Sequence, residues 1–79
     1  MQKIRQNIDI GDNLRRLRKS ANLTQEQVTA QLQVMGFDIS RSTYSKYEIN
    51  TRNIKGSELV ALKNIFKCSF DDFFEGMED

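Results

Sequence analysis

The chain has 79 residues and a formal net charge of +1, with no histidine and one cysteine. Its length predicts a single domain with a small core. The lone Cys68 and the missing histidine argue against a zinc site and an internal disulfide, and the sequence has no Gly-rich phosphate loop or catalytic carboxylate pair. We therefore expect no enzyme, no cofactor and no metal. Without a membrane-spanning run or a signal sequence, we expect a cytoplasmic protein.

The charges are distributed unevenly along the chain. Residues 1–55 hold ten Lys or Arg against five Asp or Glu, a balance of +5, whereas residues 56–79 hold two against six, a balance of −4. A basic front and an acidic tail suit a protein that meets a polyanion with one side only. The alternative is a chance scatter of solvated charges.

The first segment predicts an arm followed by a helix. Residues 1–8 contain two cations, and we expect a frayed terminus there, with an arm along a phosphate backbone as the alternative. Asp9 can cap a helix that runs to Ser20, and Asn22 ends it in a left-handed conformation. One side of this helix carries Ile10, Leu14 and Leu17, and its second half carries Arg15, Arg16, Arg18 and Lys19. The cations suit either a polyanion or the negative end of the helix dipole.

A second helix is predicted from its capping residues. Residues 24–27 (TQEQ) have the pattern of a capping box, with a hydroxyl at the cap and an amide three residues later. Gln25 lies at the start of this helix, where free backbone N–H groups attract phosphate. The residues expected to face the core, here and in the following turn, are Val28, Leu32, Met35, Phe37 and Ile39.

Residues 40–50 predict the helix that the rest of the chain supports. At about 100° per residue, one side carries short polar groups and cations and the opposite side carries two tyrosines. Ser40 is a good N-cap, and Asn50 a left-handed stop. Serines are poor helix formers, but their short side chains leave a surface that can lie close to another molecule, as in the DNA major groove. The polar side is Arg41, Ser42, Ser45, Lys46 and Ile49, and the aromatic side is Tyr44 and Tyr47.

The last third of the chain predicts two more helices. Ser57 can cap a fourth helix that runs to about Lys67, and Ser69 a short fifth one with a capping-box pattern. Cys68, between them, is expected to be a small buried hydrophobe. The fourth helix turns Leu59, Leu62 and Phe66 inward. The expected fold is all-α, with five helices in one compact domain.

With these helices in place, the chain resembles the Xre-like helix-turn-helix family, the relatives of phage repressors. The matching segments are residues 14–18 (LRRLR), 23–28 (LTQEQV), 40–48 (SRSTYSKYE) and 68–74 (CSFDDFF). The resemblance implies a compact, lambda-repressor-like DNA-binding domain of bacterial or phage origin. In this scheme residues 1–8 are an arm, residues 9–76 the helix-turn-helix domain and residues 77–79 a tail.

The resemblance also implies a site. Residues 41–49 would enter the major groove, where Arg41 or Lys46 can donate to O6 and N7 of guanine. Contacts to the phosphate backbone would position the protein without reading sequence. The implied base-reading residues are Ser40, Arg41, Ser42, Ser45 and Lys46, and the implied backbone contacts are Gln25, Thr43, Tyr47, Asn50, Arg52 and Lys55. In this family the residues matching Arg18 and Glu48 often form a largely buried ion pair between the first and third helices.

Two features depart from the family pattern. Several residues more than in the compact phage-repressor version lie between Leu32 and Ser40, which predicts a longer second helix and a reshaped turn. The glycine that usually follows the Glu is absent, so Asn50 must supply the C-cap.

The expected function is that of a sequence-specific regulator of transcription that binds double-stranded DNA, with a repressor favoured. A protein-interaction module, such as an antitoxin that holds its toxin, is the alternative. A short fifth helix cannot turn three phenylalanines into its own core. We therefore predict a weak homodimer on an inverted-repeat operator, with Phe70, Phe74 and Met77 at its interface. The alternative is that Phe70 and Phe73 pack on the first and fourth helices while Phe74 stays half exposed.

Overall fold

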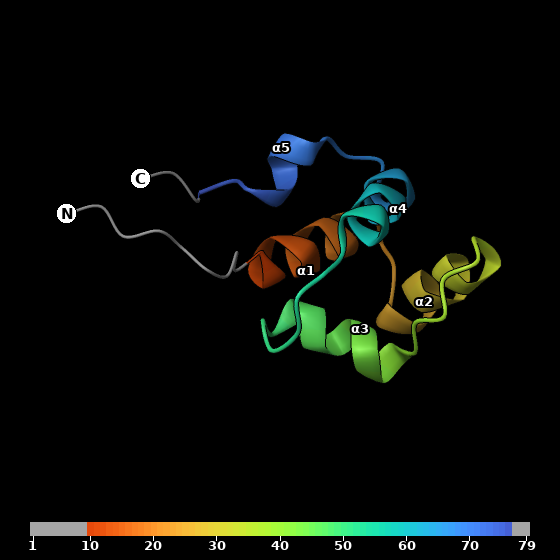
Figure 1. The fold of residues 1–79 in the computed structure, drawn as a ribbon. Helices are drawn as coiled ribbons and strands as arrows, with labels where there is room; N and C mark the ends of the chain where they lie inside the picture. The colour runs from red at the N-terminus through yellow and green to blue at the C-terminus, as the bar shows by residue number, and fades with distance from the viewer. Residues whose placement is uncertain (1–9, 77–79) are drawn as a thin grey trace.

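Five α-helices follow one another through residues 10–76, the part of the chain that the computed structural model describes (Figure 1). They are α1 (Gly11–Ser20), α2 (Gln25–Val34), α3 (Arg41–Glu48), α4 (Gly56–Phe66) and α5 (Phe70–Phe73). The predicted all-α fold is confirmed for this part of the chain. The predictions on residues 1–9 and 77–79, among them the arm, the Asp9 cap and Met77, lie outside the described residues.

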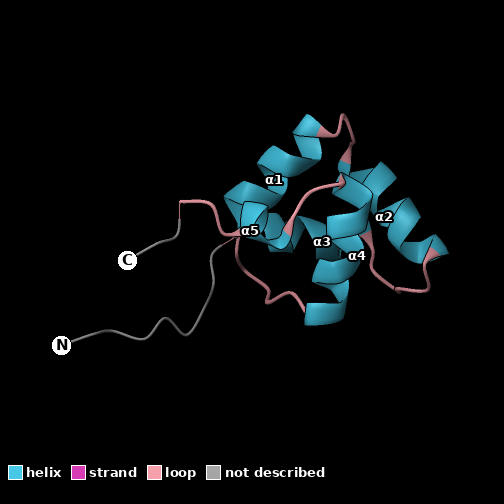
Figure 2. Ribbon diagram, turned by 90° about the horizontal axis from the view of Figure 1, so that it is seen from above, coloured by secondary structure: helices cyan, strands magenta, loops and turns pink. Residues whose placement is uncertain are grey.

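Helix α1 is at the centre of the arrangement. It packs against α3, α4 and α5, while α2 packs against α3 and α4. In Figure 1, α3 and α5 lie on opposite sides of α1, and Figure 2 shows the helices from above, joined by loops. None of the described helices is long and apolar enough to cross a membrane. Because α1 separates α3 from α5, the surfaces of these two helices face different directions.

The core takes apolar side chains from all five helices. The inward positions predicted on the first, second and fourth helices are largely confirmed, with Leu59 and Phe37 only partly buried. The prediction that Met35 faces the core is wrong, because the residue is 46% exposed. Gly36 turns the chain at a φ of +99°, and the Phe37 N–H then donates to the carbonyl of Leu32 at 2.9 Å. Phe37 is thereby brought back against the core in place of Met35.

Three of the predicted helix caps, those of α2, α3 and α5, are present. Thr24 and Gln27 form the capping box of α2, with bonds of 2.8 and 3.1 Å. The Ser40 hydroxyl caps α3 by accepting the Thr43 N–H, and Ser69 and Asp72 form a capping box at the start of α5. Asn22 and Asn50 have the predicted left-handed conformation, with φ values of 60° and 63°.

The boundaries of α4 correct the prediction. Ser57 is not the cap, because α4 begins at Gly56 and its N-cap is Lys55, two residues before Ser57. The carboxylate of Glu58 accepts the Lys55 N–H at 3.1 Å. At the other end Lys67 is not helical but caps α4 in a left-handed conformation with a φ of 57°. An acidic residue in the first turn therefore replaces the expected serine.

The start of α1 is held by the end of α3. Ile10 occupies the N-cap position without a side-chain cap, and the Gly11 N–H instead donates to Oδ1 of Asn50 at 2.9 Å. A methyl group added to Gly11 would overlap the backbone carbonyl of Glu48. The two helices therefore approach as closely as a glycine permits. This contact sets the position of α3 relative to α1.

Candidate nucleic-acid interface

The implied base-reading residues lie on the side of α3 away from the core. Arg41, Ser42 and Lys46 are exposed, and Ser45 is half-buried. Two hydroxyls are used within the helix: that of Ser40 accepts a backbone N–H of the first turn at 3.1 Å, and that of Ser45 donates to the carbonyl of Ser42 at 2.9 Å. The exposed side chains with full positive charge on α3 are thus Arg41 and Lys46.

Tyr47 does not fit the predicted set of backbone contacts. Its hydroxyl donates to Oε1 of Glu58 at 2.7 Å, and the residue is buried. Burial and this hydrogen bond raise the pKa of Tyr47 to about 12. The hydroxyl therefore joins α3 to α4 and does not face a phosphate, which corrects the prediction. Of the other residues in the set, Asn50, Arg52 and Lys55 are exposed, while Gln25 and Thr43 are half-buried.

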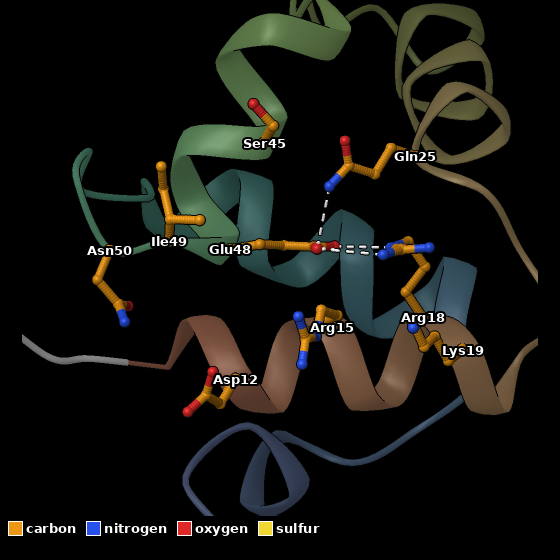
Figure 3. Close-up of a pocket in the computed structure, with 9 residues that line it drawn as sticks. All are labelled: Asp12, Arg15, Arg18, Lys19, Gln25, Ser45, Glu48, Ile49 and Asn50. Carbon is orange, nitrogen blue, oxygen red and sulfur yellow. Dashed lines mark hydrogen bonds and ion pairs between the residues drawn. The ribbon is translucent and has the colours of Figure 1, made fainter.

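The ion pair implied by the resemblance is present beneath α3 (Figure 3). Nε of Arg18 lies 2.7 Å from Oε2 of Glu48, and Nη2 lies 3.2 Å from Oε1. The two side chains are 11% and 3% exposed. Burial by itself raises the pKa of Glu48, but the hydrogen bonds and charge of Arg18 outweigh it, so the pKa lies below its usual value. The pair joins α1 to α3 in a fixed orientation.

Gln25 belongs to the same network, which the sequence pattern did not reveal. Its amide nitrogen donates to Oε1 of Glu48 at 3.0 Å, so the first residue of α2 is tied to the last residue of α3. Arg18 also donates to the carbonyl of Leu23 at 2.9 Å, in the loop before α2. A phosphate contact by Gln25 stays a prediction, and its side chain already has a structural partner.

Another cation of α1 has a partner on the side of α1 opposite α3, just after the end of α5. Arg16 forms an ion pair with Glu75 at 2.9 Å. Asn13 donates to the carbonyls of Phe73 and Glu75 at 2.8 and 3.0 Å. These contacts hold the chain after α5 against α1. Arg16 therefore faces away from α3 and has a role in the fold.

The other two cations of α1, Arg15 and Lys19, line a cleft of about 520 Å³ between α1 and α3 (Figure 3). Both are exposed, and their spacing of four residues places them on one side of α1. Spacing alone does not separate them from Arg16 in the sequence, because Arg16 lies three residues before Lys19, a spacing that also places side chains on one side of a helix. Within the described residues no group of metal-ligating side chains gathers to hold an ion. The remaining lining residues are Asp12, Arg18, Gln25, Ser45, Glu48, Ile49 and Asn50.

Helix α5 carries the phenylalanines for which an interface was predicted. Phe73 is fully buried, whereas Phe70 and Phe74 are 43% and 38% exposed. Nζ of Lys63 lies 5.5 Å from the centre of the Phe70 ring, a distance typical of a cation–π contact. Met77, the third predicted residue, lies outside the described part of the chain. The acidic residues Asp71, Asp72 and Glu75 lie on or beside the same helix.

This fold and surface define a helix-turn-helix domain, in which α2 and a polar, cationic α3 are held together by the Arg18–Glu48 network. The family model described as Helix-turn-helix matches residues 14–73. The chain therefore belongs to the Xre-like, lambda-repressor-like helix-turn-helix family, whose members are DNA-binding regulators. No curated protein and no solved structure gives a match to the chain.

Proposed function

We propose that this protein binds double-stranded DNA sequence-specifically, with residues 41–49 in the major groove, and that it represses transcription by occupying its site. The observation that carries the proposal is the solvent side of α3. Arg41 and Lys46 are exposed there, while Tyr44 and Tyr47 bury the opposite side. Arginine and lysine donate to O6 and N7 of guanine, the commonest specific contact in the major groove.

Cations around α3 would supply contacts to the phosphates. Arg15 and Lys19 lie across the cleft from α3, and Arg52 and Lys55 are exposed on the loop that follows it. Such contacts fix the register of a protein on the duplex and dominate the salt dependence of binding. We therefore add Arg15 and Lys19 to the proposed phosphate contacts because of their position, and we remove Tyr47.

Selection of bound sites from a random duplex pool tests the proposal. Arg41→Ala or Lys46→Ala should then weaken binding to the best site by roughly 1–3 kcal/mol and leave thermal stability nearly unchanged. Arg52→Ala should weaken all sequences alike and lower the salt slope by about one unit. If Arg41→Ala binds the best site as tightly as the parent protein at the same salt, α3 is not the reading helix.

We further propose a weak homodimer that DNA completes, in which Phe74 contacts a second copy. Two symmetric copies would place their α3 helices roughly 34 Å apart, one turn of DNA, on an inverted repeat. Carboxylates around Phe74 would repel one another across this contact, so salt should strengthen the free dimer. The same exposed rings support the alternative function, in which the domain docks another protein.

Sedimentation with a half-site and with a full inverted repeat separates these possibilities. Two copies should bind the full site cooperatively, and Phe74→Ala should abolish the cooperativity without changing half-site affinity. Val34→Ala is the matched control, because Val34 is an exposed apolar residue at the end of α2. Independent binding of parent copies to the full site would contradict the dimer, and failure to enrich any duplex would favour the interaction module.

A further inference from the structure

One residue on the polar side of α3 is apolar. Ile49 follows α3 directly, with a φ of −104° and a ψ of 11°, and the residue is 66% exposed. Arg41, Ser45 and Ile49 are spaced four residues apart, so they form a row along one side of the helix. Ile49 thus lies within the surface assigned to base reading.

Nothing in the fold of residues 10–76 requires an isoleucine there. The side chain is outside the hydrophobic core and lines the polar cleft between α1 and α3, beside Ser45 and Asn50 (Figure 3). Asn50, the next residue, supplies both the left-handed turn and the cap of α1. Burial of the exposed part of this isoleucine would contribute free energy only when a ligand covers it.

The chemistry of the major groove identifies the apolar group that Ile49 can cover. Its side chain has no hydrogen-bond donor or acceptor, so it cannot read the polar pattern of a base edge. The apolar feature on these edges is the C5-methyl group of thymine. Contact between a branched aliphatic side chain and this methyl group removes both from water.

We propose that Ile49 is a specificity-determining residue that packs on the C5-methyl group of a thymine in the bound site. This inference rests on the proposed function and adds a second base preference to that of Arg41. Eight residues of helix separate the two side chains by roughly 12 Å, the length of three to four base-pair steps. The thymine should therefore lie within about four base pairs of the guanine that Arg41 contacts.

The test compares duplexes that differ in this methyl group alone. The full chain is used to select sites from two random pools, one made with thymine and one with uracil, which lacks the C5-methyl group. The parent protein should prefer thymine at one position of the first pool and lose that preference with uracil. On the best duplex, uracil at that position should weaken binding roughly four-fold, the effect of one buried methyl group.

Variants assign the effect to Ile49. Ile49→Ala should bind the thymine and uracil duplexes equally. Val60→Ala is the control, because it shortens an exposed branched side chain away from α3, on α4, and it should discriminate like the parent. Placing 5-methylcytosine instead of cytosine at that position should strengthen binding by the parent but not by Ile49→Ala. All three proteins should have the same melting temperature.

The failures of the two proposals are distinguishable. If a site is enriched but no thymine-to-uracil exchange changes the affinity of the parent, or if Ile49→Ala still discriminates, the role of Ile49 is refuted and the proposed function stands. If neither pool yields an enriched site, the proposed function fails and the role of Ile49 fails with it.

Discussion

Replacing Glu48 by alanine should destabilise the fold by roughly 3–5 kcal/mol, because the change strands a buried guanidinium. The Glu48 carboxylate accepts two hydrogen bonds from Arg18 and one from Gln25. After its removal Arg18 keeps the carbonyl of Leu23 as a partner, which cannot neutralise its charge. A domain of this length has a total stability of roughly 4–12 kcal/mol, so the change should remove about a quarter of it or more.

Urea unfolding followed by circular dichroism measures this loss. Glu26→Ala is the matched control, because Glu26 is an exposed acid in the first turn of α2 and should contribute less than about 1 kcal/mol. Arg18→Met combined with Glu48→Leu should recover most of the stability, since neither charge is then buried alone. A Glu48→Ala protein that unfolds at the urea concentration of the parent would refute the reasoning.

The same pair predicts the response to acid. The pKa of Glu48 lies below its usual value despite burial, because Arg18 favours the ionised form. The resulting stability is present above the unfolded-state pKa of about 4.3 and is lost as the pH falls through the lower folded-state pKa. Glu48→Gln should be less stable at neutral pH and should lack this part of the acid-dependent loss. An unchanged pH profile in Glu48→Gln would assign the loss to other carboxylates.

Three further predictions concern the contacts of α3. Gly11→Ala should cost roughly 1–3 kcal/mol in urea unfolding because its methyl group meets the Glu48 carbonyl, whereas Gly56→Ala, where an added Cβ meets no atom within 4 Å, should be neutral or stabilising. Asn50→Gly should lose only the bond to Gly11, about 0.5–1.5 kcal/mol, and Asn50→Ala should lose more because of its positive φ; equal losses would contradict this. Because folding raises the pKa of Tyr47 to about 12, the neutral hydroxyl stabilises the fold below about pH 10, and this stability is lost as the pH rises toward 12. Tyr47→Phe should therefore lose less stability than the parent protein between these pH values.

The sequence alone determined much of the local structure of this protein. Thr24, Ser40 and Ser69 identify helix starts because a cap is a contact between residues three positions apart. Asn22 and Asn50 identify left-handed ends for a similarly local reason, since few residues tolerate a positive φ. Periodicity separated the tyrosine side of α3 from its polar side. These signals depend on a few neighbouring residues, which are read directly from the chain.

Tertiary structure decided which partner each polar side chain has. The four cations of α1 have the same character in the sequence, yet Arg18 pairs with Glu48, Arg16 pairs with Glu75, and Arg15 and Lys19 line the cleft beside α3. The sequence predicts a phosphate contact for the hydroxyl of Tyr47, but the packing of α4 against α3 places Oε1 of Glu58 2.7 Å from it. Hydrogen bonds in a buried site are made to whatever group the packing brings close, here across 30 residues between Arg18 and Glu48. Such partners are fixed by the crossing of helices and not by the spacing of residues within one helix.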